Sequence, residues 1–201
     1  MAKEKDLIII SDEVYEKIIF DGLRHVSIAS FPGMYERSIV LNGFSKAYAM
    51  TGWRIGYCGG PAEIVNAMAT IQSQSTSNPS SIAQKAATVA IGGDQSCIAD
   101  MVIHFKARHD FFCDGLNRIP GIRVLPAAGT FYVFCDVAGA IAALGLADDN
   151  AFAELLLEKG GVAGVPGSGF GAPGHIRFSF AVSMPTLEQA LERIERALKK
   201  A

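Results

Sequence analysis

The chain has 201 residues, half of them hydrophobic, and a formal net charge of -2. This apolar content is enough for a core, in one domain or in two small ones. Because the charge is nearly balanced and the basic residues are scattered, we expect neither nucleic acid nor an anionic membrane as a partner. The longest apolar stretches are short or interrupted by glycine, which argues against a membrane-spanning helix.

The cysteines give a second constraint. There are four, Cys58, Cys97, Cys113 and Cys135. None forms a CxxC pair, so a zinc site is not expected, and their wide spacing argues against a disulfide framework. The polar N-terminus shows no hydrophobic core of a signal peptide. Together these features predict a cytoplasmic protein with reduced thiols.

The first part of the chain is predicted to contain buried strands. Residues 7–10, 38–41 and 54–58 are short apolar runs of the kind found in strands that are buried on both faces of a parallel sheet. The first run ends at the acidic pair Asp12-Glu13. Polar residues at the ends of such strands are where open α/β sheets bind ligands.

Helices are predicted to follow. Residues 61–73 have an amphipathic spacing, residues 82–91 form an alanine-rich helix that ends at Gly92-Gly93, and residues 94–118 read as one long helix. After residue 120 we expect strands at 122–125, 130–135 and 176–181, helices at 151–159 and 187–200, and a loop or frayed helix at 137–147. We place a domain boundary near Arg118, at the end of the long helix.

Chemistry is concentrated in residues 41–57. This stretch follows a predicted strand and contains one lysine, Lys46, and one arginine, Arg54. A lysine just past a buried strand can be partly desolvated, which frees its amine as a nucleophile. An arginine offers a bidentate site to phosphate or carboxylate. Taken alone, the same residues are better explained by a surface lysine and an arginine in a structural salt bridge, because isolated lysines and arginines are usually solvated.

The stretch resembles the lysine signature of the class I aminotransferases, which are fold-type-I enzymes that use pyridoxal phosphate. The matching positions are Ser45-Lys46, Thr51-Gly52-Trp53-Arg54 and Ile55-Gly56-Tyr57. The resemblance implies that Lys46 forms the Schiff base with pyridoxal 5'-phosphate and moves a proton to and from the substrate α-carbon. It also implies that Arg54 holds the cofactor phosphate.

Two flanking segments extend the resemblance. Ser11-Asp12-Glu13-Val14-Tyr15 is similar to the family segment in which an aspartate pairs with the pyridine nitrogen and a tyrosine contacts the phenolic oxygen of the cofactor, which implies these roles for Asp12 and Tyr15. A carboxylate keeps that ring nitrogen protonated. By themselves, Asp12 also fits a helix N-cap and Tyr15 fits core packing.

The segment around Arg177 resembles the family's C-terminal region, where an arginine binds the α-carboxylate of the substrate. An arginine between Ile176 and Phe178 is costly to bury without an anion, so a carboxylate partner is expected, although a structural acidic residue would serve as well. His175 is interpreted as a loop residue. Residues 128–132 are similar to a segment that lines the substrate side.

The resemblance covers residues 6–199 and implies an α/β fold. Residues 1–118 would be the C-terminal part of the cofactor-binding large domain, a mostly parallel sheet with helices, and residues 119–201 a small α/β C-terminal domain. Relatives also have an N-terminal half and often a phosphate-binding serine at the position of Gly43. We therefore expect an incomplete sheet with an exposed edge, and either a homo-oligomer or pairing with an N-terminal half.

Three functions are compatible with these residues. The first is an aspartate-aminotransferase-like transfer of an amino group from an amino acid to a 2-oxo acid, with the present chain incomplete for catalysis. The second is a carbon–sulfur lyase or a decarboxylase on the same scaffold, since a fold does not select among these reactions. The third is a catalytically incompetent structural or interaction module. Product analysis separates the first two, and cofactor affinity identifies the third.

Overall fold

The computed structural model describes residues 1–199, and the chain divides into two compact units, Met1–Asp100 and Met101–Ala201. Both units combine helices with a sheet, which confirms the predicted α/β class. The boundary between the units lies inside the long helix that the sequence predicts. The division into domains at residue 118 stays a prediction.

The sheet of the first unit has three strands in the order β1-β2-β3, which are β1 (Ile9–Asp12), β2 (Ser38–Gly43) and β3 (Gly56–Gly59). β1 runs parallel to β2, and β3 runs antiparallel to it. The sheet is therefore mixed. The carboxyl ends of β1 and β2 share one edge with the start of β3, where Gly56 pairs with Gly43. Segments that leave or enter the sheet at Asp12, Gly43 and Gly56 consequently lie near one another.

The prediction that residues 7–10 are buried on both faces is wrong for this chain. Leu7 is 47 % exposed, Ile8 57 % and Ile10 68 %. Among the described strands, β1 has only β2 as a neighbour, so its second edge and part of its apolar surface are uncovered. The predicted exposed edge with an uncovered apolar face is thereby confirmed.

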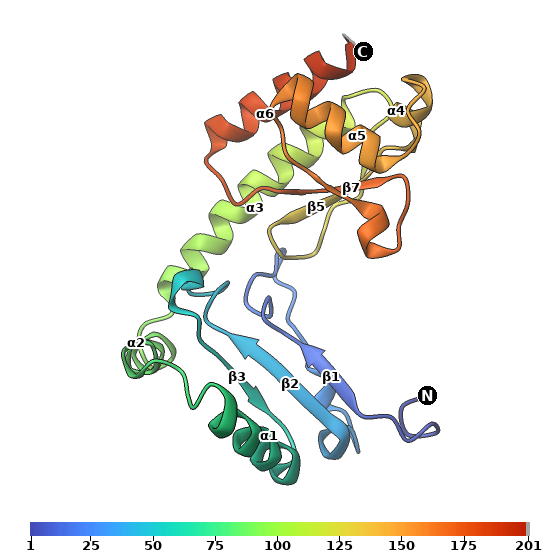
Figure 1. The fold of residues 1–201 in the computed structure, drawn as a ribbon. Helices are drawn as coiled ribbons and strands as arrows, with labels where there is room; N and C mark the ends of the chain where they lie inside the picture. The colour runs from blue at the N-terminus through green and yellow to red at the C-terminus, as the bar shows by residue number, and fades with distance from the viewer. Residues whose placement is uncertain (200–201) are drawn as a thin grey trace. The chain divides into compact units, whose positions relative to one another are not determined.

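Two helices follow β3 on the side away from β1, as Figure 1 shows. They are α1 (Ala62–Ser75) and α2 (Ser81–Gly92), close to the predicted bounds. α2 places Ala87 in a small core cluster with Phe44 and Met50. α2 therefore supports the segment that follows β2.

α1 packs much less than its amphipathic pattern suggests. No described residue of this helix is buried, and Ile71 is 71 % exposed. Met68, which lies on the same predicted stripe, is also exposed. The apolar stripe of α1 is thus a second uncovered surface of the first unit.

The second unit is built on an antiparallel sheet in the order β4-β5-β7-β6. Its strands are β4 (Arg123–Val124), β5 (Tyr132–Asp136), β6 (Val165–Pro166) and β7 (His175–Ser179). Its helices are α3 (Ser96–Asn117), which begins in the first unit, α4 (Ala138–Ala143), α5 (Asp149–Leu155), which a π-helical turn extends to Gly160, and α6 (Met184–Lys199). Lys200, which the sequence analysis includes in the last helix, lies outside the described residues.

β7 alternates strictly between the two faces of this sheet. Ile176 and Phe178 are buried, and the Phe178 ring meets Phe112 of α3 edge to face, with 6.0 Å between centroids. His175 and Arg177 lie on the opposite, more open face. His175 is the first residue of β7 and not a loop residue as predicted, because it pairs with Asp136.

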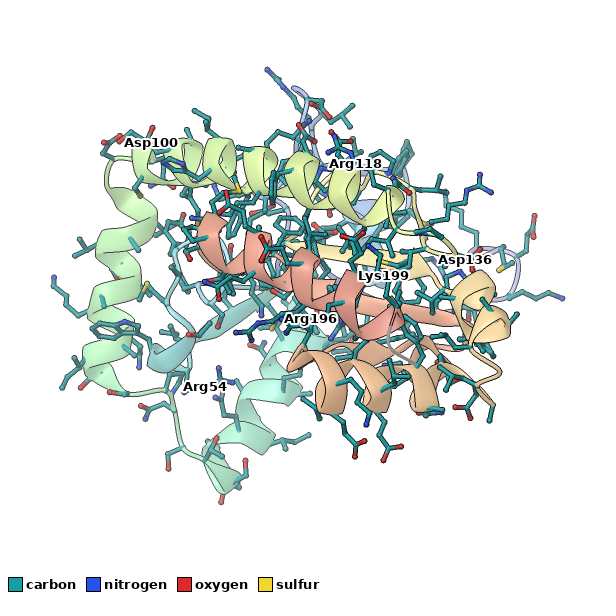
Figure 2. The ribbon with its side chains drawn as sticks, turned by 90° about the horizontal axis from the view of Figure 1, so that it is seen from above. Arg54, Asp100, Arg118, Asp136, Arg196 and Lys199 are labelled. Atoms are coloured by element: carbon teal, nitrogen blue, oxygen red, sulfur yellow. The ribbon has the colours of Figure 1, made fainter. Side chains whose placement is uncertain are left out.

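α6 closes the core of the second unit. Leu187 and Ile194 are almost fully buried. Gly115 of α3 leaves room for the Leu191 side chain, because a Cβ on residue 115 would clash with it. The helix ends with Arg196 and Lys199 in its last turn (Figure 2), where positively charged side chains interact favourably with the helix dipole. The predicted closing amphipathic helix is confirmed.

The four cysteines carry free thiols. Burial raises the pKa of Cys113 to about 11 and that of Cys135 to about 12. Both thiols therefore stay protonated at neutral pH and act as packing groups. Among residues 1–199, no helix has the length and hydropathy needed to cross a membrane.

Candidate active site

A cleft of about 450 Å³ opens at the edge of the first sheet where β1 and β2 end. The residues that line it come from three segments: Asp12 and Val14 after β1; Leu41, Asn42, Gly43, Ser45 and Lys46 at the end of β2; and Thr51, Arg54, Ile55 and Gly56 before and in β3. Three of the residues singled out from the sequence, Asp12, Lys46 and Arg54, therefore meet in one cleft.

Asp12 is the last residue of β1 and is exposed. Its Oδ1 accepts a hydrogen bond from the Val14 backbone N–H at 3.2 Å. This contact closes a local turn, and no helix starts there, so the alternative role of Asp12 as a helix N-cap is not realised. Its carboxylate lines the cleft.

Lys46 lies in a tight turn directly after β2. The Tyr48 N–H donates to the Phe44 carbonyl at 3.3 Å, and the Ala49 N–H donates to the Lys46 carbonyl at 3.2 Å. The lysine side chain is half-buried, and its Nζ lies 5.6 Å from the centroid of the Tyr15 ring. The turn thus brings Tyr15 beside the amine, although Tyr15 does not line the cleft itself.

Aromatic side chains pack together to support this turn. Phe44 is buried, and its ring centroid lies 5.4 Å from that of Tyr48 and 5.7 Å from that of Tyr57. The Tyr48 hydroxyl donates to Oε1 of Gln95 at 2.9 Å. Burial raises the pKa of Tyr48, so its hydroxyl remains a donor at neutral pH. The backbone around Lys46 is therefore fixed at both ends.

Arg54 is not in a strand, contrary to the prediction for residues 54–58. β3 begins only at Gly56, and Arg54 has φ +50°, in the left-handed region that non-glycine residues rarely adopt. Its Nη1 donates to the Thr51 carbonyl at 3.0 Å, which helps to stabilise this conformation. The side chain is exposed and projects from the loop before β3 (Figure 2). Such backbone outliers are concentrated at functional sites.

The two glycines that pair across β2 and β3 differ in their surroundings. A Cβ on Gly56 would lie 2.9 Å from the Asn42 carbonyl oxygen, which is closer than real Cβ contacts allow. A Cβ on Gly43 would meet nothing nearer than 3.5 Å. Gly56 is therefore required for the close approach of the strands, whereas Gly43 has room for a small side chain that would face the cleft.

A buried carboxylate next to Asp12 was not found from the sequence. Glu13 accepts hydrogen bonds from the hydroxyls of Ser27 at 2.8 Å and Ser11 at 3.0 Å, and its Oε2 lies 2.8 Å from Nε2 of His25. Burial raises the pKa of Glu13, but the hydrogen bonds from Ser27, His25 and Ser11 together bring it below its ordinary value. The cluster ties the segment after β1 to residues 25–27. No local pattern links positions 13 and 27, so only the fold reveals it.

Arg177 lies in β7 of the second unit. Its Cζ is 4.3 Å from the centroid of Tyr132 and 4.5 Å from that of Phe170, so the guanidinium lies over two aromatic rings at cation–π distance. Among the described residues of this unit, no carboxylate forms an ion pair with it. The structural acidic partner that the sequence left open is therefore not found there. The edge of the guanidinium, with its N–H groups, is the part that can bind a planar anion.

Comparison with known proteins identifies the family. The family model for aminotransferase class I and II matches residues 1–194. The aspartate/prephenate aminotransferase of Nitrosomonas europaea is 50% identical over 205 residues, an alignment that covers 98% of this chain and 52% of that protein. The aspartate aminotransferase of Bacillus sp. strain YM-2 is 44% identical and is covered to 51%.

Solved structures agree. The aspartate aminotransferase of Rhizobium meliloti matches with a TM-score of 0.91 and 42% identity, over 98% of this chain and 51% of that one. The aromatic aminotransferase of Pyrococcus horikoshii matches with a TM-score of 0.91 and 40% identity, over 99% and 53%. The chain spans about half the length of the curated relatives it matches. Because its sequence and its fold both match, the chain belongs to the aminotransferase class I and II family.

Proposed function

We propose that this chain is the lysine-bearing part of an aminotransferase that uses pyridoxal 5'-phosphate to move an amino group from an amino acid, aspartate in the first instance, to a 2-oxo acid. Members of the family depend on this cofactor and act on amino acids and 2-oxo acids. One observation carries the proposal: a carboxylate, an amine and a guanidinium, from Asp12, Lys46 and Arg54, line one cleft.

The chemistry of this donor set fits the cofactor. Arg54 supplies a permanent positive charge for a phosphate, and the hydroxyls of Ser45 and Thr51 lie in the same lining. Asp12 supplies a negative charge for a protonated ring nitrogen. Lys46 supplies the amine that attaches an aldehyde. The site thus offers a complementary group to the phosphate, the ring nitrogen and the aldehyde of pyridoxal phosphate.

When bound, pyridoxal phosphate withdraws electrons from the substrate α-carbon and so makes its proton acidic. In the proposed mechanism Nζ of Lys46 takes that proton and returns it, as a general base and acid. The Tyr15 ring beside Nζ limits the positions of the amine and partly shields it from water. Asp12 would hold the protonated ring nitrogen, and Arg54 would hold the phosphate.

We assign to Arg177 the α-carboxylate of the substrate. The aromatic rings of Tyr132 and Phe170 both lie within 4.5 Å of its Cζ, and the N–H groups of the guanidinium can make a bidentate contact with a carboxylate. A carboxylate that binds in this way is held in a fixed plane, which orients the α-carbon of an amino acid. The same contact would serve every α-amino acid, so it does not select the side chain.

Further polypeptide is part of the proposal. Asp12 and Arg54 are exposed, and exposed charges bind a ligand weakly because water competes with them. The uncovered surfaces of β1 and α1 offer a place for that polypeptide. We propose that a second copy of the chain, or an N-terminal half like that of the relatives, covers them and completes the site.

Complementation tests the function. The chain is co-expressed with the N-terminal half of the Nitrosomonas europaea relative, and transfer of 15N from aspartate to 2-oxoglutarate is measured by mass spectrometry. We expect transfer that is lost in Lys46→Ala and kept in Lys85→Ala, because Lys85 is exposed on α2, far in sequence from the cleft segments. Decarboxylated or eliminated products without transferred nitrogen would instead assign the lyase or decarboxylase reaction.

A further inference from the structure

Asp149, the first residue of α5, is fully buried in the second unit. Both oxygens of its carboxylate bind the same residue, Ser168. Oδ2 accepts a hydrogen bond from the Ser168 backbone N–H at 2.7 Å, and Oδ1 accepts one from the Ser168 hydroxyl at 2.6 Å. A buried carboxylate is costly unless such bonds satisfy it, so this arrangement requires a specific partner at position 168.

The carboxylate is ionised in this position. The hydrogen bond from the Ser168 hydroxyl, followed by that from the Ser168 backbone, holds the pKa of Asp149 below its ordinary value although burial opposes this. The backbone of Asp149 itself and that of Gly174 contribute in the same direction. Asp149 therefore acts as a charged anchor between α5 and the segment that leads into β7.

Ser168 belongs to a short turn, Gly167–Phe170, that is packed closely against the start of β7. A Cβ on Gly167 would lie 2.7 Å from the Cβ of His175 and would also meet the Ala172 carbonyl oxygen. The Ala172 N–H donates to the Gly167 carbonyl at 3.0 Å. The position of the turn thus depends on close contacts along its inner side and on Asp149 at Ser168.

Phe170 ends this turn, and its ring centroid lies 4.5 Å from Cζ of Arg177. The second ring is Tyr132, whose centroid lies 4.3 Å from Cζ and which β5 holds in the sheet. One wall of the guanidinium site is therefore part of the sheet, and the other depends on the turn. The Phe170 side chain is half exposed, and its ring meets that of Phe134 in β5 edge to face, with 6.2 Å between centroids, so the sheet holds it only in part.

We propose that Asp149 is a positioning residue for carboxylate binding by Arg177: it fixes the turn at Ser168, the turn places Phe170, and Phe170 with Tyr132 holds the guanidinium with its N–H edge free. The inference rests on the proposed role of Arg177 and deepens it. It assigns a function to a buried acidic residue that touches neither the substrate nor the cofactor in that proposal.

The test uses the full chain and NMR of the arginine Nε–H groups, with Arg177→Lys to assign the Arg177 signal. The two rings shift this signal by their ring currents, and titration with succinate as the carboxylate probe gives an affinity. In Asp149→Asn and in Ser168→Ala we expect the signal to move toward the value of an exposed arginine, and the succinate dissociation constant to rise by about tenfold or more. Ser168→Thr, which restores a hydroxyl, should recover both.

Asp148→Asn is the matched control. Asp148 is the exposed neighbour that caps α5 by accepting the Ala151 N–H at 2.9 Å, and asparagine caps a helix equally well. It should leave both readouts unchanged. If Asp149→Asn does not fold, Ser168→Ala still tests the proposal, because Ser168 is exposed and its truncation disturbs the fold less.

The inference is overturned if Ser168→Ala and Asp149→Asn keep the wild-type Arg177 signal and succinate affinity and change only thermal stability. It is equally overturned if the wild-type chain shows no Arg177-dependent binding of succinate. Cofactor attachment at Lys46, measured separately, reports on the proposed function, so failure of the two ideas can be told apart.

Discussion

At the scale of single residues, Gly43 offers the most direct way to strengthen the cofactor site. Its Cβ position has ordinary contacts only, and the residue lines the cleft with Lys46 and Arg54. We predict that Gly43→Ser folds and retains pyridoxal phosphate more tightly, because its hydroxyl adds a donor near the phosphate partner Arg54. One hydrogen bond to a charged group contributes about 1.5–3 kcal/mol, or about tenfold or more in affinity.

Equilibrium dialysis with pyridoxal phosphate measures that gain. Gly43→Ala is its control, because it adds the Cβ without the hydroxyl and should bind as the wild type does. Gly56→Ala should destabilise the chain instead, since its Cβ would meet the Asn42 carbonyl oxygen at 2.9 Å. Equal cofactor affinity in the serine and alanine variants of Gly43 would show that this side of the cleft does not face the phosphate.

The Glu13 cluster predicts a pH dependence of stability. The pKa of Glu13 is lowered in the folded chain, mainly because the bonds from Ser27, His25 and Ser11 outweigh burial. Its contribution is therefore present above the pKa of the unfolded chain, about 4.3, and is lost as the pH falls through the lower folded pKa. Glu13→Gln should lower the free energy of unfolding by about 1–3 kcal/mol at pH 7.

Urea unfolding of wild type and Glu13→Gln over a pH series checks this. The difference between the two proteins should shrink as the pH falls below about 4.3. A difference that stays constant down to the acid transition would mean that the charge of Glu13 contributes nothing, and that only its packing matters.

At the scale of elements, α1 and α6 both carry apolar residues at helical spacing, but α6 is the more strongly amphipathic and the two differ in burial. α6 buries Leu187 and Ile194 in the second unit, whereas Ile71 of α1 is exposed. We predict that Ile194→Ala lowers the free energy of unfolding by about 2–5 kcal/mol, as for other buried truncations. Ile71→Ala should change it by less than about 0.5 kcal/mol in the isolated chain.

Thermal unfolding of the two variants, followed by circular dichroism, is the measurement. If Ile71→Ala is as damaging as Ile194→Ala, the apolar stripe of α1 is covered in solution, and association of the chain is the first explanation to examine by repeating the scan at several concentrations.

The same elements show how far the sequence leads. Helices were located well, because the periodicity over residues 82–91 and 94–118 is long and the glycines at 92–93 punctuate it. The start of β3 was misplaced, because the left-handed backbone at Arg54 leaves no mark in hydropathy. The burial of residues 7–10 was also overestimated. An apolar run indicates that a strand is suited to burial on both faces, but it does not show which segments cover those faces.

Site residues divide in the same way. Asp12, Lys46 and Arg54 could be grouped from the sequence through the resemblance of their segments to the class I aminotransferases, and not through strand positions, because residues 54–58 were predicted as a strand. The partner of Asp149, 19 residues away at Ser168, could not be predicted, because the pairing depends on where α5 meets a turn. Tertiary contacts of this kind leave no local pattern in one sequence.

At the scale of the whole molecule, the uncovered surfaces predict association. Ile10 is exposed on the edge strand β1 and Ile8 directly before it, and unpaired strand edges with apolar side chains bind other chains. We predict a concentration-dependent oligomer in sedimentation velocity experiments. Ile10→Lys should shift the distribution toward monomer, because a lysine on an edge strand opposes pairing.

Ile103→Lys provides a comparison, since this exposed residue lies on α3, away from β1 in sequence. If it dissociates the oligomer as strongly as Ile10→Lys does, the contact is not specific to the strand edge. A chain that stays monomeric at every concentration would contradict the proposal that these surfaces bind a second copy, and would leave an N-terminal half as their partner.

The central claim is that Lys46 is the amine that holds the cofactor, and reduction with borohydride tests it most directly. The chain is mixed with pyridoxal phosphate, reduced, digested and mapped by mass spectrometry, beside Lys46→Ala and the Lys85→Ala control. We predict a cofactor label on Lys46 in the wild type and in Lys85→Ala, with none of the site-specific label in Lys46→Ala. A label distributed equally over the exposed lysines, and unchanged in Lys46→Ala, would contradict the account.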